Sequence, residues 1–193
     1  MANTKGKNVQ IKSKATDIRS IYIRSPKVPA QIIETSKVAF VFSCPGRKEH
    51  EANQVCYGAT GNNLKVLISY CHSKKKTYFK SSEKDDYTIT NASDRVHYNE
   101  LTGDTEATLK EICLVENLDR FRKDLANVKY VICMGKNALY AANQAGLNAK
   151  IIEGEHLSLV HLNTSYKSQK ASGKERLIDC IHQVADKILA QLP

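Results

Sequence analysis

The stretch Val38-Ala39-Phe40-Val41-Phe42-Ser43-Cys44-Pro45-Gly46 decides the fold. Its first five residues are apolar and β-prone, and Pro45-Gly46 turns the chain into a loop, so the stretch predicts a buried strand and its end. A second run of this kind, Tyr130-Val131-Ile132-Cys133-Met134, stops at Gly135. Continuous apolar strands are typical of parallel sheets, which are covered by helices on both faces.

Apolar residues between and after these runs recur at helical spacing. The pattern i, i+3, i+4, i+7 of one helix face is formed by Leu64, Leu67, Ile68 and Cys71. We expect this helix to begin at residues 61–63. Three more helices are predicted at residues 118–128, 137–145 and 177–188. Three more strands are predicted at residues 87–90, 149–152 and 157–162. This alternation predicts an α/β fold of three layers, α/β/α, with a central, mostly parallel sheet of four to five strands.

The composition suggests a single domain at residues 15–193, preceded by a flexible basic N-terminal arm at residues 1–14. Lys and Arg total 29 against 20 Asp and Glu, a net charge of +9, which favours nucleic acid as the partner and an anionic membrane second. No window approaches 18 apolar residues, so we expect no membrane span.

The six cysteines show no C-x-x-C pair and lie in apolar segments, at Cys44, Cys56, Cys71, Cys113, Cys133 and Cys180. This pattern indicates reduced, mostly buried thiols in a cytoplasmic protein. We therefore expect no metal site and no cofactor, and we expect a monomer.

Ligands of parallel α/β sheets bind at the carboxyl ends of the strands. Three segments are therefore of interest, namely residues 43–46, residues 91–95 and the chain around His161. The motifs in these segments resemble those of the uracil-DNA glycosylase superfamily, and most of all its thermostable iron–sulfur branch. That branch reads Gly-Glu-Ala-Pro-Gly, then a Glu three residues on, and then Gly-x-Ala-Gly opening a helix. Here Pro45-Gly46, Glu49 and residues 58–61 stand at similar spacing.

Further motifs of the family follow in the same order. A predicted strand ends in Asn91, Glu111-Ile112-Cys113 precedes a helix, and Val131 to Ala138 reads VICMGKNA. Last comes His161, after a predicted strand, where the family has His-Pro-Ser. The resemblance extends over about two thirds of the chain, from Val38 to Asn163.

The resemblance implies a monofunctional DNA glycosylase that flips out a base, hydrolyses its N-glycosidic bond and leaves an abasic site. Asn91 would read the base, since an amide both donates and accepts hydrogen bonds. His161 would donate to the departing base. The implied base pocket consists of Cys44, Pro45, Gly46, Cys56, Tyr57 and Asn91. The implied DNA contacts, to duplex with a flipped base or to a single strand, come from Arg47, Gly58, Gly61, Lys136, Asn163 and Lys167.

The chain departs from the family at several positions. Ser43 stands where the iron–sulfur branch has its catalytic Glu, and a serine can orient a water but cannot act as its general base near neutral pH. Another carboxylate is therefore expected to help, with Glu49, Glu51 and Asp94 as candidates. The predicted catalytic set is Ser43, Asn91, His161 and, among the carboxylates, Glu49.

Two departures concern the base and the cluster. Cys56 replaces a Phe that stacks on the base, which predicts a wider pocket that need not reject a bulky substituent. Cys113 matches one ligand of the iron–sulfur cluster, but the N-terminal cysteine pair is missing, so no cluster is expected.

These departures favour a bulky or modified pyrimidine as the target, such as glucosylated hydroxymethylcytosine in phage DNA, and hence a role in antiviral defence. Two alternatives within the same fold are a uracil-DNA glycosylase of base-excision repair and a catalytically inactive DNA-binding module. A third is a hydrolase that uses Cys44 with His161. This last class is disfavoured because Pro45 has no N–H to offer an oxyanion hole.

Overall fold

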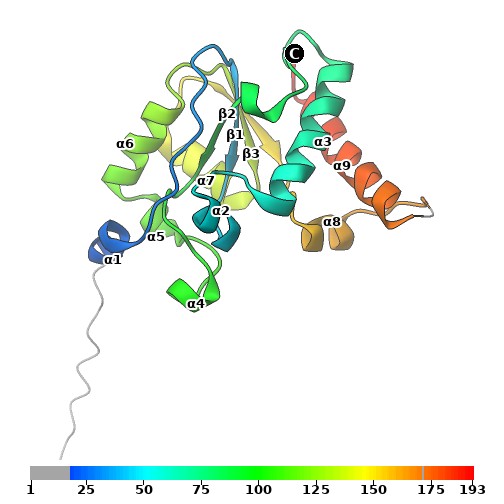
Figure 1. The fold of residues 1–193 in the computed structure, drawn as a ribbon. Coiled ribbons are helices and arrows are strands. Elements are labelled where there is room, and N and C mark those ends of the chain that lie inside the picture. The colour runs from blue at the N-terminus through cyan, green and yellow to red at the C-terminus, as the bar shows by residue number, and fades with distance from the viewer. Residues whose placement is uncertain (1–17, 171) are drawn as a thin grey trace, which may run out of the picture.

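Four strands form where the sequence has its apolar runs. In the computed structural model, which describes residues 18–170 and 172–193, they are β1 (Val38–Phe42), β2 (Thr88–Asn91), β3 (Tyr130–Met134) and β4 (Lys150–Gly154). They pair in parallel in the order β2-β1-β3-β4 (Figure 1). The predicted parallel α/β sheet is confirmed, with four strands in the described part of the chain. The predicted arm at residues 1–14 lies outside the described residues.

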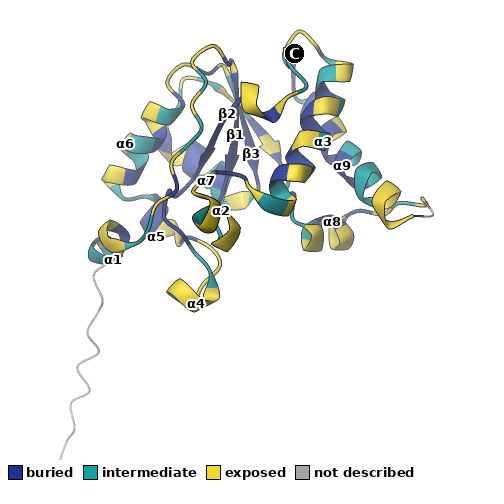
Figure 2. Ribbon diagram, viewed as in Figure 1, coloured by how far each residue is buried: buried dark blue, intermediate teal, exposed yellow. Residues whose placement is uncertain are grey.

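Successive side chains of a strand point to opposite faces of the sheet. One face presents Phe40, Phe42, Ile132 and Met134. The other presents Ala39, Val41, Val131 and Cys133. Both sets are buried, and Figure 2 shows β1 buried along its whole length. β3 is buried from Val131 on, whereas the edge strand β4 has exposed residues. The runs of β1 and β3 therefore lack any polar alternation because neither of their faces meets water.

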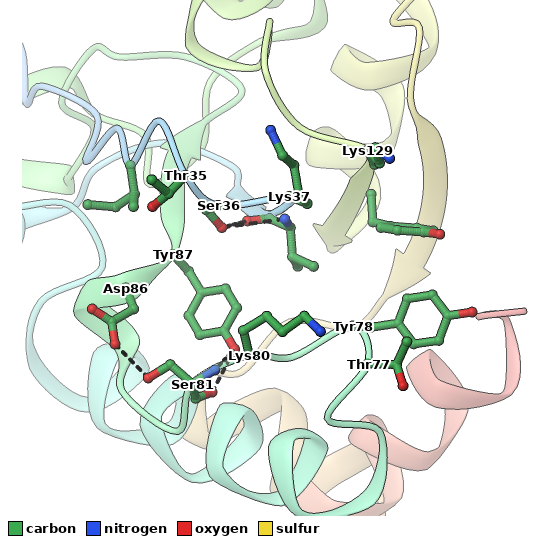
Figure 3. A pocket seen from close by; sticks show the side chains of 13 residues that line it. Thr35, Ser36, Lys37, Thr77, Tyr78, Lys80, Ser81, Asp86, Tyr87 and Lys129 are labelled. Atoms are coloured by element: carbon green, nitrogen blue, oxygen red, sulfur yellow. Dashed lines mark hydrogen bonds between the residues drawn. The ribbon is translucent and has the colours of Figure 1, made fainter.

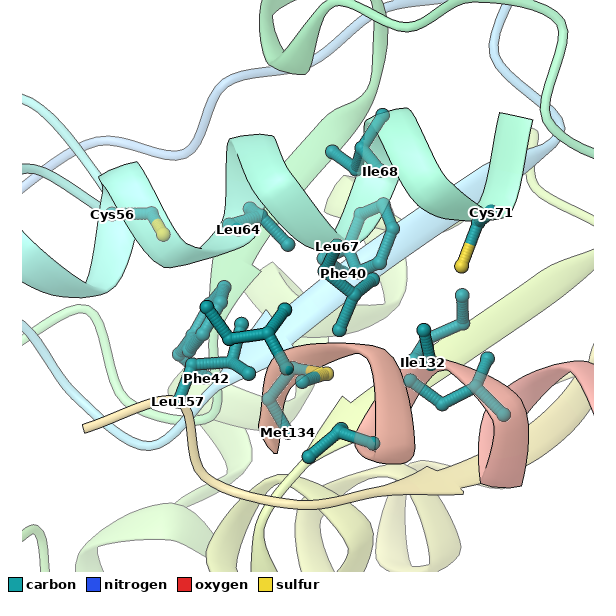
Figure 4. Packing of buried hydrophobic residues seen from close by; sticks show 14 of the residues in the cluster. Phe40, Phe42, Cys56, Leu64, Leu67, Ile68, Cys71, Ile132, Met134 and Leu157 are labelled. Atoms are coloured by element: carbon teal, nitrogen blue, oxygen red, sulfur yellow. The ribbon is translucent and has the colours of Figure 1, made fainter. Parts of the chain in front are cut away.

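The first face is covered by α3 (Gly58–Lys74) and α9 (Gly173–Ala190), which lie side by side. Leu64, Leu67 and Ile68 of α3 pack over Phe40 and its neighbours, as Figure 4 shows. The opposite face is covered by α6 (Val115–Asp124) and α7 (Lys136–Ala145). The two long helical faces predicted from spacing are confirmed, and so are the helices at α6 and α7.

Short helices connect these layers. They are α1 (Ile18–Arg24), α2 (Arg47–Ala52), the 3₁₀ helix η1 (Lys84–Asp86), α4 (Asn99–Thr102), α5 (Leu109–Ile112) and α8 (Leu159–Ser165). Of the six free cysteines, four are buried in the core, namely Cys56, Cys71, Cys133 and Cys180.

Two sequence predictions are wrong at element boundaries. Residues 157–162 do not form a strand, because the hydroxyl of Ser158 accepts a hydrogen bond from the backbone N–H of His161 and caps helix α8 there. Helix α3 begins at Gly58 rather than at residues 61–63. Gly58 has a φ of +75°, a conformation that glycine adopts easily and that lets the helix start one turn earlier.

Candidate functional site

A cavity of about 500 Å³ opens at the carboxyl edge of the sheet, where β1, β3 and β4 end. This is the edge at which parallel α/β sheets bind ligands. Its lining residues are Ser43, Glu106, Met134, Gly135, Lys136, Asn137, Glu153, Gly154, Glu155, His156 and His161. Of the predicted site residues, Ser43, Lys136 and His161 line the cavity, whereas the predicted catalytic residue Asn91 does not.

A cluster of three polar side chains lies on one wall of the cavity. The buried hydroxyl of Ser43, directly after β1, donates a hydrogen bond to the carboxylate of Glu106. The Nδ2 of Asn137, near the start of α7, lies 3.1 Å from Ser43 Oγ and 3.1 Å from Glu106 Oε2. Two donors therefore hold the Glu106 carboxylate in place beside the cavity. A carboxylate held in this way can accept a proton from a water molecule.

His156 lies on another wall, two residues after β4 ends. The backbone N–H of Ser158 donates to its Nδ1 at 3.0 Å, so the neutral ring carries its proton on Nε2. Burial is the main reason that the pKa of His156 lies below its ordinary value; the charge of Glu106 opposes this shift and His161 adds to it. At neutral pH the ring is therefore an uncharged hydrogen-bond donor.

The loop that carries His156 is anchored on both sides. The Nδ2 of Asn63, inside α3, donates to the backbone oxygen of Leu157 at 2.8 Å. Below the loop, a Cβ placed on Gly154 would lie 2.9 Å from Met134 Sδ and 3.1 Å from Cys133 O. A side chain at residue 154 would crowd the ends of β3 and β4, so glycine suits the place where the chain leaves the sheet toward His156.

His161 occupies a different environment, on α8. Its Nε2 lies 2.9 Å from Glu155 Oε2, and Lys187 Nζ lies 2.6 Å from Glu155 Oε1. Burial alone would raise the pKa of Glu155, but hydrogen bonds from Lys187, Tyr166 and His161 lower it to about 2. His161 thus pairs with a charged cluster at the cavity wall, whereas His156 is the histidine that follows the strand.

The three carboxylates considered from the sequence lie elsewhere. Glu49 Oε2 accepts the N–H of Gly46 at 3.2 Å and caps α2, and burial raises its pKa. Glu51 pairs with Lys48 on the surface at 3.2 Å. Asp94 accepts the hydroxyl of Tyr22 at 3.0 Å in a buried network. None of the three lines the cavity.

Sequence reasoning missed Glu106, Asn137 and His156. Glu106 lies in a polar loop outside any motif, so no signal in the chain marks it. His156 could have been found, because His156-Leu157-Ser158 keeps the His and the Ser of the family's His-Pro-Ser, while His161-Leu162-Asn163 keeps only the His.

The predicted base pocket is not assembled around this cavity. Asn91 is buried at the end of β2, where its backbone oxygen accepts from Arg120 at 2.8 Å. Cys56 is buried in the apolar core with Leu64 (Figure 4), and Tyr57 is 48% exposed at the start of α3. Cys56 therefore fills core space and leaves the cavity's width unchanged.

The loop between β1 and α2 holds the rest of the predicted pocket. The Sγ of Cys44 lies 3.7 Å from Thr105 O, and burial raises its pKa to about 12. Pro45 O accepts the N–H of His97 at 2.9 Å, and the N–H of Gly46 is held by Glu49. These contacts tie the loop to its neighbours and leave only Ser43 facing the cavity.

The predicted DNA-binding residues fall into two groups. The first group has contacts or a conformation that the fold itself explains. Arg47 pairs with Glu100 and lies over the Tyr98 ring, and Gly58 starts α3 with a φ of +75°. Gly61 packs closely, because a Cβ there would lie 2.1 Å from Cys56 O. The second group is exposed and consists of Lys136, Asn163 and Lys167. Within the described residues, neither lysine of this group has an ion-pair partner; Asn163 and Lys167 line a separate pocket with Arg176.

Among the described residues, no three His, Cys, Asp or Glu side chains are grouped to hold a metal ion, and no helix is long and apolar enough to cross a bilayer. No protein-family model matches the chain, and no curated protein sequence matches it. The resemblance to uracil-DNA glycosylases therefore rests on the motifs, their order and their place at the carboxyl edge of a parallel sheet.

Proposed function

We propose that the protein is a monofunctional DNA glycosylase that acts as a monomer in the cytoplasm. The observation that supports this most strongly is that His156, a neutral N–H donor, and Glu106, an oriented carboxylate, line the same cavity. Breaking a glycosidic bond calls for these two groups, since the departing base becomes anionic and the sugar must receive a water molecule.

In the proposed reaction His156 and Glu106, on two walls of the cavity, have different roles. As the C1′–N bond breaks, the Nε2–H of His156 donates to an oxygen of the departing base and stabilises its growing charge. Glu106, held by Ser43 and Asn137, accepts a proton from the water that adds to C1′. Ser43 then serves as a positioning residue, which explains how a serine can replace the family's catalytic Glu. In this proposal His156 takes the role predicted for His161.

The surface around the cavity suits an extruded nucleotide. Leu159 and Val160 of α8 follow His156 closely and are 44% and 76% exposed. Exposed apolar side chains at this place can enter the base stack and fill the gap that a flipped base leaves. Lys136 and Lys167 can contact phosphates on either side, in line with the net charge of +9.

A bulky or modified pyrimidine remains the favoured target, in antiviral defence. The support for it shifts from Cys56 to the cavity, whose volume of about 500 Å³ lies within the roughly 300–1,000 Å³ of small-molecule sites. Glu153 and Glu155 on its β4 side can accept hydrogen bonds from the hydroxyls of a sugar substituent. Excision of uracil in repair is the second candidate, supported by the same His156 and Glu106.

The test uses the purified chain and three DNAs, containing uracil, no modification, or glucosylated hydroxymethylcytosine, with abasic sites counted by an aldehyde-reactive probe. We expect sites in the modified DNA. Glu106→Gln should lower the rate by about 100-fold or more while DNA binding persists. Glu34→Gln, an exposed carboxylate outside the cavity, is the matched control and should retain the wild-type rate.

Each other outcome points elsewhere. Abasic sites in uracil DNA alone would make the protein a repair glycosylase. Binding without abasic sites in any DNA would make it the inactive DNA-binding module. If the protein neither binds any of the three DNAs nor produces abasic sites in them, the proposal is overturned.

A further inference from the structure

A second cavity, of about 630 Å³, lies at the opposite edge of the sheet, where the strands begin (Figure 3). Its walls come from the segment before β1, from the chain between α3 and β2, and from the segment before β3. Val38 and Tyr130, the first residues of β1 and β3, lie at its base. The sheet therefore separates this cavity from the candidate site, and neither the motifs nor the proposed reaction uses it.

Three lysines from these three segments line the cavity, namely Lys37, Lys80 and Lys129. All three are exposed, and within the described residues none has an ion-pair partner; Lys37 Nζ reaches only the backbone oxygen of Asn127, at 3.4 Å. The one acidic lining residue is Asp86, whose carboxylate accepts the Ser81 hydroxyl at 2.5 Å. Three lysines against one aspartate give the lining of this cavity a net positive charge, which favours an anionic ligand.

Tyrosine rings border the same space, and their positions are fixed by hydrogen bonds and packing. The hydroxyl of Tyr87 donates to Ser81 O at 2.6 Å and accepts the Ser81 N–H at 3.1 Å. Tyr78 packs edge-to-face on Tyr130, with ring centroids 5.2 Å apart. Figure 3 shows Lys80 extending between Tyr87 and Tyr78, so an ammonium group and aromatic surface lie together. A ligand would find these rings already in place, which lowers the entropy cost of binding.

We propose that this cavity binds a nucleoside phosphate. The phosphates would contact the ammonium groups of Lys80, Lys129 and Lys37, and the base would lie against the partly exposed ring of Tyr78. A single phosphate would leave most of about 630 Å³ empty, whereas a nucleotide fits the usual size of small-molecule sites, about 300–1,000 Å³. The hydroxyls of Thr35 and Thr77 can reach the sugar or phosphate oxygens.

The test is isothermal titration of the full chain with ATP, inorganic triphosphate and adenosine as separate probes. We expect ATP to bind, triphosphate to bind more weakly and adenosine not to bind. Lys80→Ala and Lys129→Ala should each weaken ATP binding about tenfold, because each removes one charge-assisted contact. Lys110→Ala, an exposed lysine of α5 that does not line the cavity, should leave ATP binding unchanged. These side chains are exposed, so the variants should fold, and thermal unfolding of each variant is the control for this.

Three results would overturn the inference. One is that no ATP binding is detected with ATP at about 1 mM, since a specific site should have a dissociation constant below this concentration. Another is equal affinity for ATP and triphosphate, which would mean a plain polyanion site. The third is ATP binding that survives both lysine variants. The abasic-site assay does not depend on this cavity, so its outcome and this one are independent.

Discussion

The backbone N–H of Ser158 donates to Nδ1 of His156 at 3.0 Å, and this bond determines which ring nitrogen can serve a substrate. With Nδ1 accepting, the proton of the neutral ring sits on Nε2. Ser158 also caps α8 through its hydroxyl, so one residue fixes both the tautomer of His156 and the start of the helix that follows.

Replacing His156 should stop the proposed reaction. We expect His156→Gln to lower the rate of base release by about 100-fold or more, because a preorganised donor to the departing base is lost. His161→Gln should cost less than about tenfold, since that ring pairs with Glu155. Single-turnover rates on the DNA that proves to be the substrate measure both. A larger loss of rate in His161→Gln than in His156→Gln would mean that His161, on α8, is the donor to the departing base.

The stability of the protein should fall on mild acidification, in part through His156. Its folded-state pKa is below 6.5, so as the pH falls the unfolded chain takes up the proton first. The contribution of neutral His156 to the free energy of unfolding is complete above about pH 6.5, and it is lost as the pH falls through the folded-state pKa of this residue. Urea unfolding between pH 7.5 and about 5 should give a slope that His156→Asn reduces, by less than about 1.4 kcal/mol per pH unit. An unchanged slope in the variant would mean that burial does not perturb this ring.

Gly61 should tolerate no side chain. A Cβ would lie 2.1 Å from the backbone oxygen of Cys56, so Gly61→Ala should cost about 2 kcal/mol or more in unfolding free energy. A Cβ on Gly173, at the start of α9, would meet nothing within 4 Å, so Gly173→Ala should be neutral or slightly stabilising. Denaturant titration compares the free energies of unfolding of the two variants. Similar values would show that the backbone at Cys56 can shift to accommodate the added Cβ at little cost.

Cys44 should be a poor nucleophile. Burial raises its pKa to about 12, so the thiolate is scarce at pH 8. Iodoacetamide should therefore label Cys44 in the native protein at least about 100-fold more slowly than in the unfolded chain, as followed by peptide mass spectrometry. Fast labelling with loss of activity would favour the Cys44–His161 hydrolase instead.

The strands that decide the fold were predictable because both of their faces are buried. Tertiary burial and local preference agree over Val38–Phe42 and Tyr130–Met134, and the structure confirms both ranges. The run at residues 157–162 is also largely apolar, but the Ser158 cap and the packing of Leu162 into the core accompany a helix from Leu159 on. A short apolar run cannot reveal by periodicity which of these applies.

The candidate site was predictable in place but only partly in its residues. The carboxyl edge of the sheet and Ser43 followed from the order of strands and loops. Glu106 did not, because its position depends on hydrogen bonds from Ser43 and Asn137, which are distant in sequence. The prediction chose His161 over His156 because it assigned an additional strand to residues 157–162, where the structure has the start of α8.

The strand order β2-β1-β3-β4 also has a consequence for how the molecule folds and frays. Parallel neighbours need a crossover between them, so contacts across this sheet are non-local and form slowly. β4 pairs with β3 alone and is an edge strand of the described sheet. Local opening there would carry away His156 while Ser43, directly after the central strand β1, stayed in place. A partly opened molecule would therefore keep Glu106 with Ser43 and Asn137 but lose His156, and the proposed reaction would stop before the protein unfolded.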